Sequence, residues 1–195
     1  MLDVVHNKIK ANSIDVASKL IVDLSKLIRQ FLESSINMDF NRIYNSDITI
    51  HNEISLLESY IKFQQLQYPD RFDYSIKYSE DIDIDNTYIP PMLIQPYVEN
   101  AIKHGILLNH QIHGVLQIDF SKSDHDTLIC KIIDNGLGIE KVKELQENHI
   151  KLHKSRGTSI VEKRIQVMQE MGIGIHLSTI ENPTGGTIIT IEIDL

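Results

Sequence analysis

Cysteine is almost missing from this chain of 195 residues, which has Cys130 alone and no tryptophan. A single cysteine allows no internal disulfide, so the composition fits a reducing compartment. No apolar run approaches the roughly 18 residues of a membrane-spanning helix, and no signal-peptide pattern is present. An excess of basic residues is missing as well, since the formal net charge is -8. We therefore expect no nucleic-acid partner, whose binding surface would be basic, and no membrane contact.

The first 43 residues have the apolar spacing of a helical hairpin. Leu2, Val5 and Ile9 form one helical stripe, residues 12–13 predict a turn, and residues 14–31 form a second stripe in steps of three and four. A stripe that begins at the first residue without a cap indicates a fragment cut inside a longer helix. The stripe is long for two helices alone, so we expect a homodimer in which two hairpins form a four-helix bundle. The alternative is that the hairpin packs on the domain that follows it.

Residues 44–195 predict a second, larger domain. Strands and helices occur in blocks rather than in strict alternation, which indicates an α+β fold, a two-layer α/β sandwich with a mostly antiparallel sheet. Alternating apolar residues predict the strands, and apolar steps of three and four predict the helices. The expected strands are residues 48–50, 72–78, 114–121, 127–133, 175–180 and 187–195, and the expected helices are residues 52–67, 95–105 and 160–171.

Residues 95–105 predict a helix that ends at Gly105. Val98 and Ile102 lie four residues apart and face a core. An amide, an ammonium and an imidazole share the opposite side of the helix, at Asn100, Lys103 and His104. Such a face suits a metal-bound polyphosphate, and the alternative is an ordinary solvated helix face. Pro96 is unexpected there, because a proline past the first turn removes a backbone hydrogen bond or kinks the helix.

A second stretch, residues 134–138, has the sequence Asp-Asn-Gly-Leu-Gly. Asp134 continues the apolar face of the strand before it. A carboxylate at the end of an apolar stripe requires a partner, and a neutral donor such as an exocyclic amine would suit it. The alternative is that Asp134 caps the turn that follows. Gly136 and Gly138 would let the backbone approach a flat base closely.

Together the two stretches resemble the nucleotide-binding boxes of sensor histidine kinases, in the GHKL superfamily that also includes gyrase, heat-shock chaperone and mismatch-repair ATPases. Residues 89–105 are similar in particular to the LytS/YehU-type kinases, whose signature is close to I-P-P-x-x-L-Q-P-L-V-E-N-A-I-K-H-G. Residues 17–32 resemble the dimerisation region of the same kinases. The resemblance implies the Bergerat ATP-binding sandwich from about residue 44 to the end.

The resemblance also implies a role for several polar residues. Asp134 would accept a hydrogen bond from the adenine amino group, Asn100 would be the Mg²⁺ ligand, and Lys103 would contact phosphate. His104 would lie near the ribose and the phosphates. Glu99 would either assist the acceptor imidazole or pair with Lys103, four residues further on.

Other parts of the resemblance are less complete. The segment between Gly138 and Gly157 would be a mobile lid over the triphosphate, and a plain surface loop is the alternative. The family has a second glycine where this chain has Ser159, which weakens a phosphate cradle. Thr187 follows a glycine pair, as in the family, where its hydroxyl would support Asp134 through water. A plain hairpin turn is the alternative there.

The resemblance implies the catalytic core of a two-component sensor histidine kinase that binds ATP and Mg²⁺. It would pass the γ-phosphoryl group to a histidine upstream of Met1, and from there to the receiver domain of a response regulator. The acceptor motif is absent here, so we expect ATP binding without autophosphorylation, in the cytoplasmic portion of a membrane-anchored bacterial receptor. Two features leave open a silent nucleotide-sensing module: Ser159, and Pro96 where related ATPases carry a water-activating glutamate. The apolar hairpin leaves open a dimeric scaffold with a vestigial pocket.

Overall fold

The computed structural model describes residues 47–123, 125–148, 156–170 and 172–195. The predicted helical hairpin of residues 1–43, and the dimer that it would form, lie outside the described residues. Residues 149–155 of the predicted lid lie outside them as well. Within the described ranges, no helix has the length and the apolar character that crossing a membrane requires.

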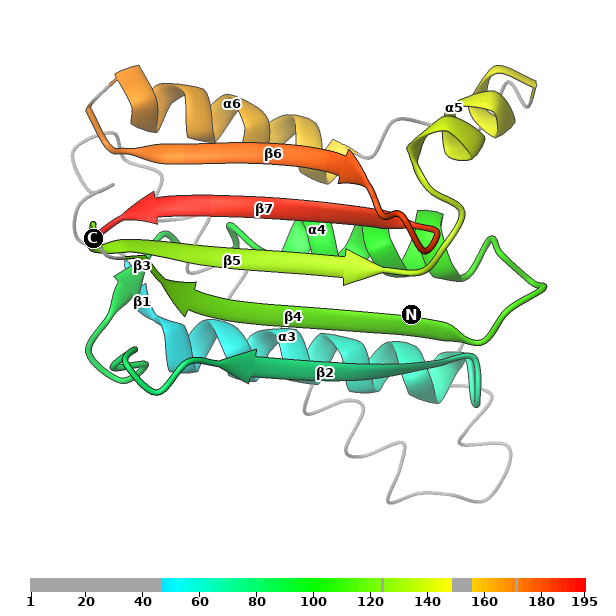
Figure 1. Cartoon of the computed structure of the whole chain (residues 1–195), viewed down its shortest axis with the longest axis horizontal. Coiled ribbons are helices and arrows are strands. Elements are labelled where there is room, and N and C mark those ends of the chain that lie inside the picture. The colour runs from blue at the N-terminus through cyan, green and yellow to red at the C-terminus, as the bar shows by residue number, and fades with distance from the viewer. Residues whose placement is uncertain (1–46, 124, 149–155, 171) are drawn as a thin grey trace.

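A five-stranded sheet forms one layer of the domain, with the strand order β2-β4-β5-β7-β6 (Figure 1). β2 runs parallel to β4, and every other neighbouring pair in this sheet is antiparallel, which confirms the prediction of a mostly antiparallel sheet. The strands are β2 (Phe72–Tyr78), β4 (Gly114–Lys122), β5 (Thr127–Asp134), β6 (Ile175–Glu181) and β7 (Thr187–Asp194).

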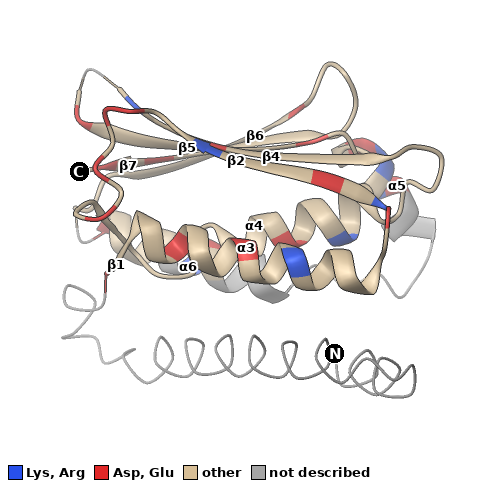
Figure 2. Ribbon diagram, turned by 90° about the horizontal axis from the view of Figure 1, so that it is seen from below, with Lys and Arg blue, Asp and Glu red and all other residues tan. Residues whose placement is uncertain are grey.

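Helices α3 (Ile50–Gln67), α4 (Gln95–Asn100) and α6 (Arg156–Glu170) lie under one face of the sheet, so the domain has the two layers that were predicted (Figure 2). A π-helix, η2 (Ala101–Ile106), continues α4 without a break. α5 (Ile139–Asn148) lies beyond the end of the strands (Figure 1). β1 (Ile48–Thr49) pairs with β3 (Tyr88–Ile89) in a separate two-stranded sheet.

The core fills the space between the two layers. Alternate residues of the strands point toward the helices, as a side-chain period of two requires. On β4 these are Leu116, Ile118 and Phe120, none of which is more than 2% exposed. The facing helices contribute apolar residues in steps of three and four, and the fully buried ones include Leu57, Ile61, Val98 and Ile102. This core holds α4 and η2 against β4 and β5, and so brings the two motif stretches together.

Two of the predicted helices begin earlier than the sequence predicts. α3 begins at Ile50, because the side chain of Thr49 accepts a hydrogen bond from the N–H of Asn52 at 3.2 Å and caps the helix. Ile50, expected at the end of a strand, is therefore helical. α6 begins at Arg156, ahead of the expected start at residue 160. α5 occupies a segment in which the sequence predicts no helix.

Candidate functional site

The helix that carries the first motif begins at Gln95. Pro96 therefore lies in the first turn, where the N–H that proline lacks would have no helical partner in any case. Pro96, which is unexpected only past the first turn, is explained by this position. Val98 and Ile102 are both 0% exposed, which confirms the predicted core-facing stripe.

Gly105 does not end the helix, and this prediction is corrected. The chain continues as the π-helix η2, after which the N–H of Leu107 donates to the carbonyl of Ile102 at 2.8 Å. Gly105 lies against the carboxyl group of Asp134, and Gly136 lies against the backbone of Gly105. A Cβ on Gly105 would lie 2.8 Å from Oδ1 of Asp134, and a Cβ on Gly136 would lie 2.2 Å from the carbonyl carbon of Gly105. The two motif stretches are therefore in direct contact.

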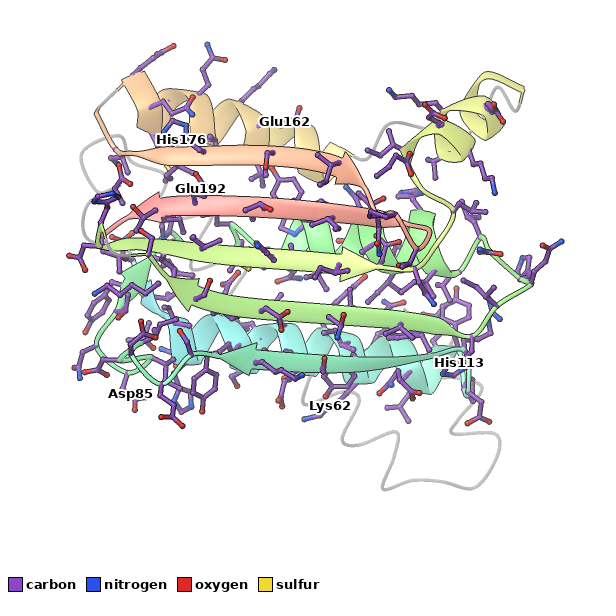
Figure 3. All side chains as sticks on the ribbon, in the orientation of Figure 1. Lys62, Asp85, His113, Glu162, His176 and Glu192 are labelled. Atoms are coloured by element: carbon purple, nitrogen blue, oxygen red, sulfur yellow. The ribbon has the colours of Figure 1, made fainter. Side chains whose placement is uncertain are left out.

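The loop after β5 is held from two sides. On the side of η2, the N–H of Leu137 donates to the carbonyl of Gly105 at 3.2 Å. On the side of β4, the amide oxygen of Asn135 accepts from the N–H of Val115 at 2.7 Å, and its amide nitrogen donates to the carbonyl of His113 at 3.1 Å. Figure 3 labels His113 at this end of the sheet. These contacts keep the loop, and Asp134 before it, in one position against the helix.

Asp134 ends β5 and is 2% exposed. The apolar residues that precede it on the same face are also buried, which confirms the predicted stripe. Its Oδ1 accepts a hydrogen bond from the N–H of Gly136 at 2.8 Å, so Asp134 does cap the turn that follows. The pKa of Asp134 is raised to about 6, mainly by burial and also by the charge of Glu181, against the opposing effect of the N–H groups of Gly136 and Thr187. A carboxylate accepts up to about four hydrogen bonds, so capacity for a ligand remains.

The hairpin between β6 and β7 approaches Asp134 from the other side. Gly186 has a φ of +89°, and a Cβ there would lie 2.6 Å from Oδ1 of Asp134. The N–H of Thr187 acts on the Asp134 carboxylate, so the structure places Thr187 beside Asp134 through its backbone. The predicted role of the Thr187 hydroxyl stays a prediction. The side-chain amide of Asn182 donates to the backbone carbonyl of Asp134 at 3.0 Å, a contact that the sequence does not predict.

Glu181, at the end of β6, has a role that no local pattern indicates. Its Oε1 accepts from the N–H of Ile139 at 2.6 Å and from the N–H of Glu140 at 3.0 Å, so it caps the first turn of α5. Gly138 has a φ of +81°, and a Cβ there would lie 2.4 Å from Oε2 of Glu181. Gly138 thus lets the chain turn past this carboxylate, and its predicted approach to a base stays a prediction.

Asn100 is the last residue of α4, at the junction with η2. Its side-chain oxygen is buried and has no hydrogen-bond partner within the described part of the chain. Buried polar atoms nearly always have a partner, so this oxygen suits a ligand from outside. Mg²⁺ accepts an amide oxygen and completes its shell with phosphate oxygens and water. Across the described residues, no group of three or more His, Cys, Asp or Glu side chains could hold a metal by itself.

Lys103 and Glu99 form an ion pair one helical turn apart, which is one of the two predicted alternatives for Glu99. Lys103 is exposed, so its ammonium can exchange this partner for a phosphate at little energetic cost. His104 is half-buried. Burial lowers the pKa of its imidazole, Lys103 lowers it further and Glu99 opposes the change. The imidazole is therefore mainly neutral at neutral pH.

The segment between Gly138 and Gly157, for which a mobile lid is predicted and a plain surface loop is the alternative, is helical at both of its described ends. Its first part is the helix α5, and Gly157 lies in the first turn of α6. Ser159 is also inside α6, which begins ahead of the predicted start at residue 160. Backbone N–H groups at a helix start can still face a phosphate. The predicted phosphate contact of Gly157 stays a prediction.

Solved structures of histidine kinases share this fold. The histidine kinase domain of a blue-light-activated histidine kinase from Erythrobacter litoralis matches with a TM-score of 0.53 at 18% identity, over 89% of this chain and 75% of that one. AdeS, a histidine kinase of Acinetobacter baumannii, matches with a TM-score of 0.52 at 19% identity, over 94% of this chain and 81% of that one. The fold is therefore that of histidine kinase domains, as the two motifs imply.

The sequence comparisons point to one group of these kinases. The chain is 30% identical over 138 residues to the sensor protein LytS of Oceanobacillus iheyensis, covering 70% of this chain and 21% of the relative. It is 28% identical over 182 residues to the sensor histidine kinase/phosphatase LytS of Staphylococcus aureus, covering 92% of this chain and 29% of the relative. The histidine kinase family model matches residues 1–72. The chain is a relative of the LytS-type sensor histidine kinases and spans less than a third of these two proteins.

Proposed function

We propose that this chain is the ATP-binding catalytic core of a sensor histidine kinase. The observation that carries the proposal is the contact between the two motif stretches through Gly105 and Gly136. This contact sets the buried carboxyl group of Asp134 beside the helix whose Asn100 has a buried oxygen without a partner in the described chain. The first group suits a purine amine, and the second suits a metal-bound phosphate chain.

Asp134 would recognise the base. Its buried carboxyl group accepts from the N–H groups of Gly136 and Thr187 and keeps the capacity to accept from one further donor. The exocyclic amino group of adenine supplies a donor at the position where guanine has an oxygen. A site built to accept that hydrogen bond rejects a base that lacks the donor. Asp134 would therefore select adenine.

The helix face beyond it would hold the phosphates. Asn100 would bind Mg²⁺ through its amide oxygen, and the ion, when bound, would neutralise phosphate charge. Lys103 would exchange Glu99 for a phosphate oxygen, and neutral His104 would donate a hydrogen bond to the phosphates or the ribose. Gly157, at the start of α6, would present backbone N–H groups to phosphate.

The transfer step needs positioning more than covalent chemistry on this chain. A ring nitrogen of an acceptor histidine forms a bond to the γ-phosphorus while the bond to the bridging oxygen breaks, and ADP leaves with that electron pair. The imidazole proton passes to a base, for which Glu99 is the candidate once Lys103 has turned to phosphate. We propose that the acceptor histidine lies upstream, that two copies pair through the N-terminal helices, and that a receiver domain takes the phosphoryl group next.

Calorimetric titration with ATP and Mg²⁺ tests the nucleotide site. We expect the parent chain to bind ATP, and Asp134→Asn to bind it at least about tenfold more weakly. The side-chain NH₂ group of the variant would face the amino group of adenine, and two donors form no hydrogen bond. Asp126→Asn is the matched control, since Asp126 is exposed in the β4–β5 turn and pairs with Lys122. If the parent binds no adenine nucleotide, the proposal is wrong and the scaffold alternative gains support.

Labelling with γ-³²P-ATP tests the transfer. We expect this chain to bind ATP without retaining acid-labile phosphate, and a longer chain with the acceptor segment to become labelled. Labelling of this chain alone would contradict the proposed place of the acceptor. ATP binding without any transfer in the longer chain would favour a silent nucleotide-sensing module.

A further inference from the structure

Two charged side chains outside the nucleotide site hold the two ends of the helix that carries Asn100. At its start, Glu53 of α3 is 0% exposed. Oε2 of Glu53 accepts from the N–H of Met92 at 3.3 Å, and Oε1 accepts from the N–H of Ile94 at 3.4 Å. Ile94 immediately precedes α4, so the carboxyl group binds the backbone that leads into the helix.

The backbone at Met92 indicates what Glu53, the anchor at the start of the helix, does. Met92 has a φ of +56°, in the left-handed region that few residues other than glycine adopt. Such a conformation persists only where the surroundings hold it. Glu53 supplies that hold through the N–H groups on either side of Leu93, which is itself 0% exposed. The turn that leads into α4 is therefore set by a side chain from α3.

Arg71, in the turn between α3 and β2, holds the other end. Its Nη2 donates to the carbonyl of Asn109 at 3.0 Å and reaches the carbonyl of Ile106 at 3.5 Å. Its Nη1 reaches the carbonyl of Ile112 at 3.5 Å. Ile106 is the last residue of η2, so the guanidinium satisfies carbonyls at the point where helical hydrogen bonding stops.

The two charges match the two ends of the helix. An acidic group at the start and a basic group at the end both have the sign that the helix dipole favours. Both come from one continuous unit, α3 and β2, which lie along the same edge of the domain (Figures 1 and 2). Between the two anchors the helix changes from α to π at Asn100, and π-helical turns are frequent at functional sites. Asp134 belongs to β5, so any shift of this helix along its axis would move Asn100 relative to Asp134.

We infer that Glu53 and Arg71 are positioning residues, which fix Asn100 at the place that a metal-bound phosphate requires. The inference rests on the proposed nucleotide site and deepens it. Both residues act through the backbone of α4 and η2 rather than through a ligand. Loss of either one should weaken the metal-dependent part of nucleotide binding and leave recognition of the base by Asp134 in place.

Calorimetry on the whole chain separates metal-dependent binding from recognition of the base. ATP is titrated once in the presence of Mg²⁺ and once in the presence of EDTA, which removes the metal. The variants are Glu53→Gln and Arg71→Gln, and the charge-matched controls are Glu58→Gln on α3 and Lys77→Gln on β2. Glu58 pairs with Lys62, which Figure 3 shows at the outer edge of the domain. We compare the ratio of the ATP affinity in Mg²⁺ to the ATP affinity in EDTA. We expect this ratio to fall about tenfold in the anchor variants, Glu53→Gln and Arg71→Gln, as for residues that orient a metal ligand. In the two controls it should change less than about twofold.

A merely structural role predicts a different result. Partial unfolding would lower both affinities together, or lower the stoichiometry, and would leave their ratio unchanged. That outcome, or a ratio that stays at the parent value in folded anchor variants, would overturn the inference.

Hydrogen exchange distinguishes failure of this inference from failure of the proposed function. We expect faster exchange of the amides of residues 92–109 in the anchor variants, and unchanged exchange in β4, β5 and β7. If this pattern appears while the parent binds no nucleotide, the proposed function fails but the two anchors still position the helix. If exchange increases everywhere or nowhere, Glu53 and Arg71 do not have this role.

Discussion

At the scale of single residues, the burial of the Asp134 carboxyl group opposes stability at neutral pH. Its pKa rises from 3.8 to about 6, mainly through burial. Between these two pH values the unfolded chain has lost the proton while the folded chain still holds it. The stabilisation that this proton provides is therefore complete below the unfolded pKa of 3.8, and it is lost as the pH rises through about 6.

Asp134→Asn should remove this pH-dependent loss, because the amide has no charge and its oxygen can still accept from the N–H of Gly136. We expect its free energy of unfolding to exceed that of the parent by about 1 to 3 kcal/mol at about pH 7.5, and the difference to vanish near about pH 4. Denaturant unfolding at both pH values measures this. Asp126→Asn, at an exposed position, should show no such difference. A variant less stable than the parent at the higher pH would contradict the prediction.

Gly136 is required by the contact between two backbones. Gly136→Ala would put a Cβ 2.2 Å from the carbonyl carbon of Gly105, where no flexible side chain can move aside. We expect a loss of about 2 to 4 kcal/mol in the free energy of unfolding, together with loss of nucleotide binding as the loop separates from η2. Gly172→Ala is the control, because Gly172 has a φ of +85° with nothing within 4 Å and should lose only about 1 kcal/mol. Equal losses in thermal denaturation would contradict this account.

The sequence predicts some site residues and not others for a physical reason. Asp134 and Asn100 lie in short segments whose own periodicity shows which way they face. Glu181 caps N–H groups 41 and 42 residues away along the chain, and Glu53 caps N–H groups 39 and 41 residues away. Only the tertiary fold brings such partners together, so neither residue has a local signal.

Among the elements, the helix α5 depends on a cap that strand β6 supplies. Glu181→Ala removes the acceptor for the first two N–H groups of α5. We expect faster hydrogen exchange in α5 and a loss of about 1 kcal/mol in the free energy of unfolding. The pKa of Asp134 should also fall, because the charge of Glu181 contributes to its rise. Glu192→Ala on β7, labelled in Figure 3, is the control. Unchanged exchange in α5 would show that the cap has no role.

Strands are predicted better than helix ends. β2 has the predicted bounds of residues 72–78, because alternation is a property of the strand itself. The starts of α3 and α5 depend on caps, and the cap of α5 comes from β6. The apolar stripe of residues 95–105 has the same appearance for an α-helix and for a helix that widens to a π turn. The change at Asn100 therefore could not be predicted from the spacing.

For the whole molecule, the order of elements predicts the layers but not the neighbours. Blocks of strands and helices indicate a sandwich with one sheet. They do not indicate that β2 lies parallel beside β4, or that β7 lies between β5 and β6. The pairing of Ile133 with Ile188 is what brings the end of β5 to the start of β7. Asp134 and Thr187 become neighbours through this pairing. The resemblance to kinases implies that these two residues lie together, whereas the periodicity of the sequence does not.

The stability of the whole domain with ligand bound tests the metal site. Mg·ATP at about one hundred times its Kd would stabilise the folded state by about 2.7 kcal/mol, a rise in Tm of about 5 to 10 °C for a domain of this size. For Asn100→Ala we expect the Tm of the chain alone to stay equal or to rise, because a buried oxygen without a partner in the described chain is removed. The Tm with ATP should then be the same in Mg²⁺ as in EDTA. Asn86→Ala, at an exposed amide, should keep the metal-dependent difference. If that difference survives in Asn100→Ala, the group that binds Mg²⁺ lies elsewhere in the chain.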